Sequence, residues 1–306
     1  MTIRTPAPVQ NIIFTHTPRV PRLVLWLGLG LLSLLSAPTL IADGTQSGTA
    51  PHRLVHFSSA GSPAYGFIDN NTITPLVGDL FSGDYRAGSG SLALESVILL
   101  PATTPSKIIA VGLNYRSHMF SSRGDVPRLF SKLPSSLSGD GDPIWLYPDS
   151  TNLHYEGELV VIIGKTARNI SVSEAPEYIF GVSAGNDVTD RSWQSSDLQW
   201  IRAKGADSFS PLAPWILRGA DYNDLLVQTR VNGEVVQSES TKNLLFSVDE
   251  IVSYASHYFT LNPGDLIYSG TPGSTRRLSA GDVVEVSVQG VGAVTNRVIQ
   301  RPPKPQ

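Results

Sequence analysis

The order of apolar and polar positions along the chain predicts many strands and few helices. The strongest strand signal is the run Glu158-Leu-Val-Val-Ile-Ile-Gly164, because a continuous apolar stretch that ends at glycine is typical of a buried strand. Residues 227–236 predict a hairpin with Asn232-Gly233 in its turn, where both central residues need positive φ. These patterns favour an α+β fold that is dominated by sheet.

The clearest helix is expected to begin at Ser247. Ser247 and Glu250 fit a capping box, and apolar residues then recur at helical spacing as far as Phe259. A second box at Ser171 predicts a short helix through Tyr178. Each of these helices is therefore predicted from its own N-terminal signal.

Two regions of different character follow the N-terminal segment. Residues 52–104 alternate in short strands and turns and predict a small N-terminal strand-rich module. Residues 105–300 contain the strong strands and the helix, and they form the predicted main domain. Within it, residues 114–148 are rich in Ser, Gly, Pro and Asp and predict a long loop that lines or covers a site.

The first 42 residues are typical of an export segment. Arg4, Arg19 and Arg22 precede the apolar stretch 23–42, as in a secretory signal, although the residues around Ala37 and Ala42 make imperfect cleavage sites. The stretch is also long enough to cross a bilayer, so an uncleaved membrane anchor is the alternative. Residues 43–51 predict a flexible leader. We expect an exported, periplasmic protein, or one that this segment holds at the membrane.

Charge and composition exclude several classes of protein. The whole chain has a formal net charge of −3, and residues 43–306 carry 20 Lys and Arg against 26 Asp and Glu. Such a chain has no basic stripe for nucleic acid. It contains no cysteine, which excludes disulfides, zinc-thiolate sites and a cysteine nucleophile.

Candidate metal ligands stand at the start of the strongest strand. Glu156 and Glu158 are two residues apart, so on a strand they point to the same face. Two carboxylates that enter a buried sheet need a cation, and oxygen ligands suit magnesium, manganese or calcium. The alternative is a solvated strand end with two surface glutamates. The glycine-rich segment that ends in Asn186-Asp187 argues against this alternative and supplies Asp187 as a third carboxylate.

Other polar residues are ambiguous when each is taken alone. His118 follows a buried strand, and Lys204 stands in the segment Ile-Arg-Ala-Lys-Gly. A lone histidine is usually structural, and a lone lysine is usually on the surface. Asp190 and Arg191 could likewise form a local surface ion pair.

These residues belong to nine collinear blocks that resemble the fumarylacetoacetate hydrolase family. The blocks include Tyr155-Glu156-Gly-Glu158-Leu and Gly185-Asn-Asp187-Val-Thr-Asp-Arg191. The complete set lies at 107–118, 130–137, 155–159, 185–191, 204, 209–215, 231–237, 263–272 and 281–286.

The resemblance implies a fold of mixed sheets rolled into a partly closed barrel, usually in a homodimer. It implies Mg²⁺, or Mn²⁺, held by Glu156, Glu158 and Asp187. Members act on small 2-oxo and β-diketo acids, partly in aromatic catabolism, and such an acid can chelate the cation. The implied catalytic residues are His118, a general base, and Lys204, which stabilises a developing oxyanion. The implied substrate-binding residues are Arg191, Gln237 and Thr271.

One position departs from the family pattern and affects the expected reaction. Many members have a glutamate three residues after the histidine, but this chain has Ser121 there, and Asp125 is the nearest candidate replacement. We expect hydrolysis of a C–C bond in acylpyruvates or related acids. The alternatives are isomerisation or decarboxylation of 2-oxo acids at the same site, or an exported protein that binds metal and oxo acid without turnover.

Overall fold

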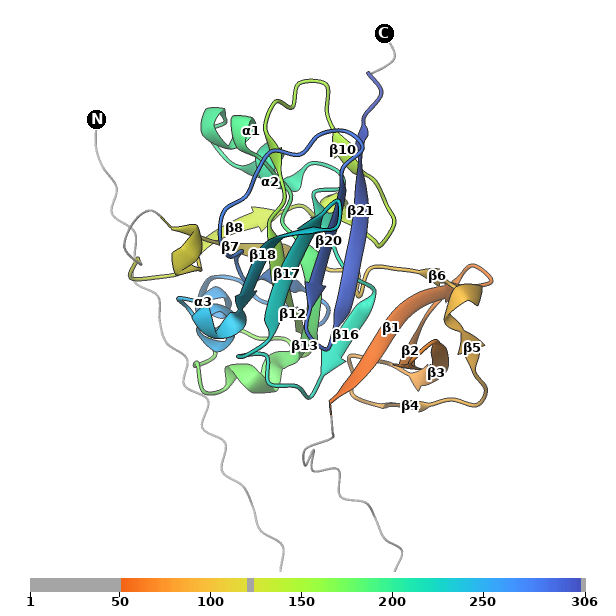
Figure 1. Ribbon diagram of the computed structural model, residues 1–306. Coiled ribbons are helices and arrows are strands. Elements are labelled where there is room, and N and C mark those ends of the chain that lie inside the picture. The colour runs from red at the N-terminus through yellow and green to blue at the C-terminus, as the bar shows by residue number, and fades with distance from the viewer. Residues whose placement is uncertain (1–50, 120–123, 304–306) are drawn as a thin grey trace, which may run out of the picture. The chain divides into compact units, whose positions relative to one another are not determined.

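The computed structural model describes residues 51–119 and 124–303 of the chain (Figure 1). The predicted export segment, 1–42, and Ser121 lie outside the described residues, and so does the leader except for Pro51. No helix in the described part of the chain has the length and apolar character that a bilayer crossing requires. Export, membrane attachment and the homodimer stay predictions.

The largest sheet has twelve strands, and its main path runs in the order β4-β3-β2-β1-β16-β13-β12-β19-β7-β8. The strands of this path are β1 (His52–Ser59), β2 (Ser62–Asp69), β3 (Thr72–Gly78), β4 (Tyr85–Ala87), β7 (Ile108–Gly112), β8 (Arg128–Lys132), β12 (Gly157–Ile163), β13 (Ile179–Asn186), β16 (Trp215–Arg218) and β19 (Leu266–Tyr268). Two short strands lie off this path, β5 (Leu92–Ala93) beside β3 and β6 (Ile98–Leu99) beside β1. The N-terminal strands therefore join the main sheet through the pairing of β1 with β16.

A five-stranded sheet in the order β10-β21-β20-β17-β18 packs against β12 and β13 (Figure 1). Its strands are β10 (Ile144–Leu146), β17 (Leu226–Val231), β18 (Glu234–Ser240), β20 (Val283–Val288) and β21 (Gly292–Gln300). Two short pairs join β11 (Leu153–His154) to β14 (Thr189–Asp190) and β9 (Leu137–Ser138) to β15 (Ser210–Pro211). Both large sheets mix parallel and antiparallel neighbours, and no closed barrel forms among the described residues.

Helices are few, as the sequence predicts. The α-helices are α1 (Arg191–Ser196), α2 (Ile201–Gly205) and α3 (Val248–Tyr258). The 3₁₀-helices are η1 (Leu94–Ser96), η2 (Arg116–His118), η3 (Pro134–Ser136), η4 (Ala175–Tyr178) and η5 (Thr241–Asn243). The expected sheet-dominated α+β class is confirmed.

The two faces of β12 explain its continuous apolar run. Leu159 and Val161 belong to the core cluster between the two large sheets, whereas Val160 and Ile162 pack in a second cluster with β7 and β19. Glu158 lies on the same face as Val160 because side chains alternate along a strand. Gly157 faces the five-stranded sheet, where a Cβ atom would lie 2.0 Å from Thr229 Oγ1.

Local signals in the sequence had different outcomes. The hairpin forms as β17 and β18, with φ of 53° at Asn232 and 84° at Gly233, and Ser247 and Glu250 form the complete capping box of α3. The helix predicted after Ser171 is a 3₁₀-helix that begins only at Ala175. The long loop predicted over 114–148 is wrong in its secondary structure, because this segment contains η2, β8, η3, β9 and β10. Its expected place at a cavity is confirmed, since His118 and Phe130 line one.

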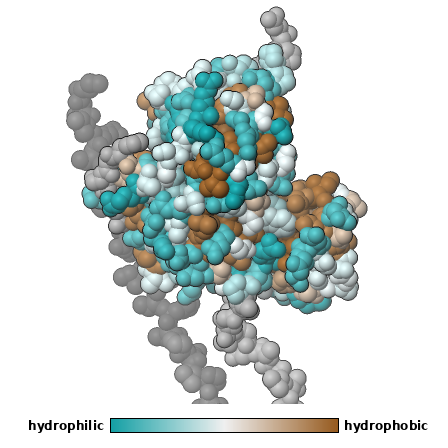
Figure 2. Space-filling model, in the orientation of Figure 1, coloured by the Kyte–Doolittle hydropathy of each residue, from teal (hydrophilic) through white to brown (hydrophobic). Residues whose placement is uncertain are grey.

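Exposed apolar side chains are scattered over the surface. Val77 in β3 and Ile98 in β6 are examples from the N-terminal strands, and Figure 2 shows brown patches over this part at the right of the view. The strongest concentration of buried charged side chains lies elsewhere, beside β12 and β13.

Candidate metal centre and active site

The register between β12 and β13 brings the predicted carboxylates together. Glu158 pairs with Gly185, and the backbone N–H of Asp187 donates to the carbonyl of Glu156 at 2.8 Å. All three carboxylates are buried, and ligand oxygens from the three residues lie within 4.8 Å of one another. In the described part of the chain, this is the only group of three or more acids, histidines or cysteines close enough to hold a metal ion.

Two buried lysines hold Asp187 from both sides. Lys204 in α2 places Nζ 2.5 Å from Asp187 Oδ2 and 2.5 Å from Glu156 Oε2. Lys132, at the end of β8, places Nζ 2.5 Å from Asp187 Oδ1 and also donates to the carbonyl of Lys204. Lys132 lies in a block of the family resemblance, but no role was assigned to it from the sequence.

Arg191 neutralises Glu156 from a third direction. It is the first residue of α1, whose N-cap Asp190 accepts from the N–H groups of Ser192 and Trp193. Its guanidinium donates to Glu156 Oε1 and, at 2.8 Å, to Gln194 Oε1. A local surface pair of Asp190 with Arg191 is therefore not what forms.

Charge and burial set the pKa values of the two glutamates in opposite directions. Burial acts to raise the pKa of Glu156, but the charges of Lys204 and Arg191 outweigh it and hold that pKa well below its usual range. Burial raises the pKa of Glu158 well above its usual range, and the nearby charges of Asp187 and Glu156 add to this rise. Glu158 accepts one backbone hydrogen bond, from Gly270 at 2.7 Å, and pairs with no cationic side chain among the described residues.

The pKa values of the two buried lysines also shift in opposite directions. Burial lowers the pKa of Lys132 despite the attraction of Asp187. Burial also acts to lower the pKa of Lys204, but there the charges of Asp187 and Glu156 outweigh it and raise the pKa.

The residues present fit a divalent cation. Glu158 is a fully buried carboxylate without a cationic partner among the described residues, and it stands beside two other carboxylates. Carboxylate oxygens are the ligands that magnesium and manganese prefer. A cation held by Glu156, Glu158 and Asp187 would supply the positive charge that Glu158 lacks.

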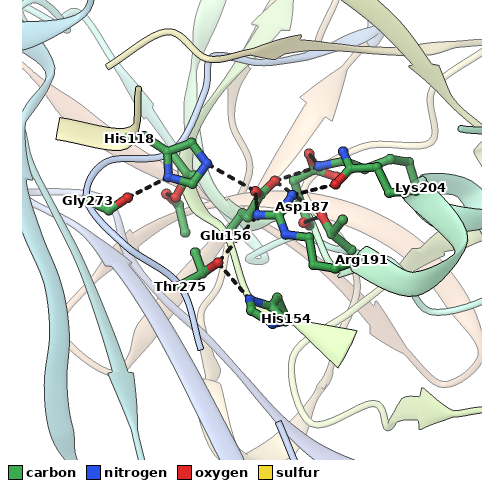
Figure 3. Close-up of polar contacts among 12 residues, drawn as sticks. His118, His154, Glu156, Asp187, Arg191, Lys204, Gly273 and Thr275 are labelled. Atoms are coloured by element: carbon green, nitrogen blue, oxygen red, sulfur yellow. Dashed lines mark hydrogen bonds and ion pairs between the residues drawn. The ribbon is translucent and has the colours of Figure 1, made fainter. Parts of the chain in front are cut away.

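His118 approaches Glu156 from the side opposite Lys204 (Figure 3). Its Nε2 lies 3.5 Å from Glu156 Oε1, and its Nδ1 contacts the carbonyl of Gly273. Glu156 is the only acid among the described residues that pairs with this imidazole. Asp125 therefore does not replace the missing glutamate.

Gln237 and Thr271 contact each other and the strand between the two glutamates. Gln237 Nε2 donates to Thr271 Oγ1 at 2.9 Å, and Thr271 Oγ1 donates to the carbonyl of Gly157 at 2.9 Å. Gln237 Oε1 accepts from the N–H of Gly157 at 3.1 Å. Thr271 lines the cavity over the carboxylates, and Gln237 lies behind it.

The cavity over the carboxylates has a volume of about 220 Å³, which suits a small acid. Leu113, Phe130 and Trp200 give it an apolar wall, and Arg191 and Gln194 give it a polar one. Leu113 has φ of 57°, a left-handed conformation that costs a non-glycine residue about 1–2 kcal/mol. Such strain is concentrated at functional sites, in keeping with the place of Leu113 on this wall.

Sequence reasoning missed a second group behind Arg191. Thr275 Oγ1 accepts from Arg191 and contacts Nδ1 of His154 at 2.8 Å (Figure 3). Burial, helped by the charge of Arg191, lowers the pKa of His154 to about 4. The only sequence signal for His154 is that it lies two residues before Glu156.

Sequence models of two protein families match this chain. The sequence model of the family described as fumarylacetoacetate (FAA) hydrolase C-terminal matches residues 107–299, and one described as Rv2993c-like, N-terminal, matches residues 52–101. Oxaloacetate tautomerase fahd2, mitochondrial, from Xenopus laevis is 32% identical over 295 residues, which cover 83% of this chain and 92% of the relative.

Two solved structures are similar over most of the chain. A 2-hydroxyhepta-2,4-diene-1,7-dioate isomerase from Mycobacterium marinum has a TM-score of 0.76 and 34% identity, and the match covers 82% of this chain and all of that one. A fumarylacetoacetate hydrolase from Exiguobacterium antarcticum has a TM-score of 0.75 and 34% identity, with the same coverage. The names of these relatives include a tautomerase, an isomerase and a hydrolase.

Proposed function

Because the chain belongs to the fumarylacetoacetate hydrolase family, we propose that it is a divalent-metal-dependent enzyme that generates enolate character in a small 2-oxo or β-diketo acid. The observation that carries this proposal is the buried cluster of Glu156, Glu158 and Asp187, in which Glu158 has no cationic partner among the described residues. A divalent cation bound there would supply Lewis-acid polarisation of a carbonyl oxygen.

The remaining groups fit the same chemistry. Lys204 and Arg191 add positive charge next to the cluster, where negative charge would develop on the oxygens of an oxo acid. His118 has a ring nitrogen that faces Glu156 and can exchange a proton with a bound molecule. Leu113, Phe130 and Trp200 would contact the carbon chain of that molecule.

Keto–enol tautomerisation or isomerisation of a 2-oxo acid is our first candidate reaction. Tautomerisation moves one proton between carbon and oxygen, and isomerisation moves one between two carbons. The single base His118 suffices for either transfer. The specific observation in favour is that no second acid among the described residues pairs with the imidazole, apart from the candidate metal ligand Glu156.

Hydrolysis of a C–C bond in an acylpyruvate, which the sequence analysis placed first, is the second candidate. The similar structure that is named a fumarylacetoacetate hydrolase favours it. It shares the enolate-like charge but also needs a positioned and activated water molecule.

The test is an assay of the purified full chain with oxaloacetate, acylpyruvates and a ring-cleavage dienoate. The enol band of oxaloacetate reports tautomerisation, and loss of the acylpyruvate band reports cleavage. Each reaction is measured with EDTA, Mg²⁺ or Mn²⁺, and with the variants Glu156→Gln and, as a matched surface control, Glu177→Gln. We expect metal-dependent turnover that is lost in Glu156→Gln and unchanged in Glu177→Gln. Turnover that survives both EDTA and Glu156→Gln would refute the proposal, and binding of metal and oxo acid without turnover would favour a binding protein.

A further inference from the structure

A chain of polar contacts leads from the surface hairpin to His118. Glu239, in β18, accepts from Ser117 Oγ, and its other oxygen accepts from Nδ2 of Asn243 at 3.0 Å. Ser117 Oγ in turn accepts from the backbone N–H of Gly273 at 2.9 Å. The carbonyl of Gly273 contacts Nδ1 of His118, as Figure 3 shows.

The direction of every hydrogen bond in this chain follows from the groups involved. An ionised carboxylate only accepts, so the single hydrogen of the Ser117 hydroxyl points to Glu239. The oxygen of Ser117 is then free to accept from Gly273. A carbonyl also only accepts, so Nδ1 of His118 carries its hydrogen in both protonation states.

Gly273 is contacted from both sides, because its N–H group donates to Ser117 and its carbonyl contacts His118. It has φ of 62°, and it belongs to the segment 270–275, which also contacts Glu158 and Arg191. Without the hold on its N–H group, the Gly273 carbonyl has more freedom to turn away from the imidazole. The ring would then lose the partner that distinguishes its two nitrogens.

We propose that Glu239 is a positioning residue for His118. Through Ser117 and the backbone of Gly273, it fixes the imidazole with hydrogen on Nδ1 and with Nε2 facing the carboxylate cluster. The kinetic consequence rests on the proposed function, but the state of the imidazole does not.

The first experiment measures the imidazole directly. The full chain is labelled with ¹⁵N-histidine, loaded with Mg²⁺ and studied by NMR without substrate, and the His118 signals are assigned by their loss in His118→Gln. We expect the shifts of an imidazole with hydrogen on Nδ1. In Ser117→Ala and Glu239→Gln, they move toward the average of two tautomers. In the second variant, the amide that replaces the carboxylate offers only one acceptor oxygen to two donors.

The second experiment measures turnover by the same variants on any substrate that the full chain converts. We expect kcat to fall by about tenfold with KM and magnesium affinity unchanged. Ser117→Thr restores the hydroxyl and is expected to restore kcat. Glu285→Gln is the control, because Glu285 is a half-exposed carboxylate that pairs with Arg230 at 3.4 Å and has no link to Gly273.

Unchanged ring shifts in Ser117→Ala and Glu239→Gln would overturn the inference, whatever the activity. A loss of kcat that magnesium affinity and stability follow equally would also overturn it, because such a loss is structural. If no oxo acid is converted, the proposed function fails, while the NMR result still decides the inference about Glu239.

Discussion

Lys132 offers the sharpest test of how charge is balanced at the carboxylate cluster. Its side chain is fully buried, and its Nζ donates to Asp187 at 2.5 Å and to the carbonyl of Lys204. Lys132→Met keeps an unbranched apolar chain of similar length but removes the charge. Among the described residues, Asp187 then keeps Lys204 as its only cationic partner.

The size of the effect follows from the surroundings of Asp187. Removal of one partner from a buried ion pair lowers the free energy of unfolding by about 3–5 kcal/mol. We expect a value near the lower end, about 3 kcal/mol, because Lys204 remains. In saturating Mg²⁺ the cation adds positive charge beside Asp187, so we expect the loss to shrink to about 1.5 kcal/mol. The difference requires that the variant bind Mg²⁺ about tenfold more tightly than the parent chain.

Urea unfolding with EDTA and with Mg²⁺ measures both losses, and calorimetric titration measures the affinity. Lys107→Met is the control, since Lys107 pairs with buried Asp265 at 2.5 Å but is itself partly exposed. Asp265 also accepts from the backbone of Ser106 and Lys107, so this control should lose about 1 kcal/mol with or without metal. An equal loss in Lys132→Met with and without Mg²⁺ would refute the reasoning.

Three further variants test the fold that carries the site. Gly157→Ala would place its Cβ atom 2.0 Å from Thr229 Oγ1. We therefore expect urea unfolding to show a free energy of unfolding lower by about 1–3 kcal/mol, and we expect weaker Mg²⁺ binding. The second substitution Thr229→Ala should partly restore both. Ser247→Ala removes the cap of α3 and should lower the free energy of unfolding by about 1 kcal/mol. We expect kcat to be unchanged, because no residue of α3 lines the cavity over the carboxylates, and a change in kcat would contradict this separation. Burial lowers the pKa of His56, so stability should be complete above the ordinary pKa of about 6.5 and should fall as the pH drops below it. The variant His56→Asn should flatten this acid limb of the stability curve.

Patterns that are local in sequence predicted local structure well. Three patterns each specify the local conformation: the apolar run of β12, the Asn232-Gly233 turn and the capping box at Ser247. They do so because periodicity, positive φ and side-chain caps act over a few residues. Glu156 and Glu158 were expected to share one face for the same reason. That Asp187 joins them depends on the register of β12 with β13, which the sequence alone does not specify.

The missed elements have a common physical cause. β8 escaped prediction because Ser131 and Lys132 interrupt its apolar pattern, and Lys132 is buried through an ion pair that a hydropathy pattern cannot anticipate. The α-helices α1 and α2 are too short to show helical periodicity. Gln237 was predicted to bind substrate, but its hydrogen bonds to Gly157 and Thr271 became visible only when distant segments were placed together.

The distribution of charge also explains why one carboxylate cluster can serve several reactions. Three cationic side chains attach to Glu156 and Asp187, and none of the described ones attaches to Glu158. Glu158 is therefore the carboxylate that a bound cation would neutralise, and a cation there would stabilise the charge in every reaction that develops enolate character. The reaction is decided outside the cluster, by the groups that handle protons. Proton return to carbon needs only the Nε2 of His118, whereas hydrolysis also needs a water molecule held against it. Among the described residues, no acid other than Glu156 pairs with that imidazole, which is why tautomerisation comes before hydrolysis in our proposal.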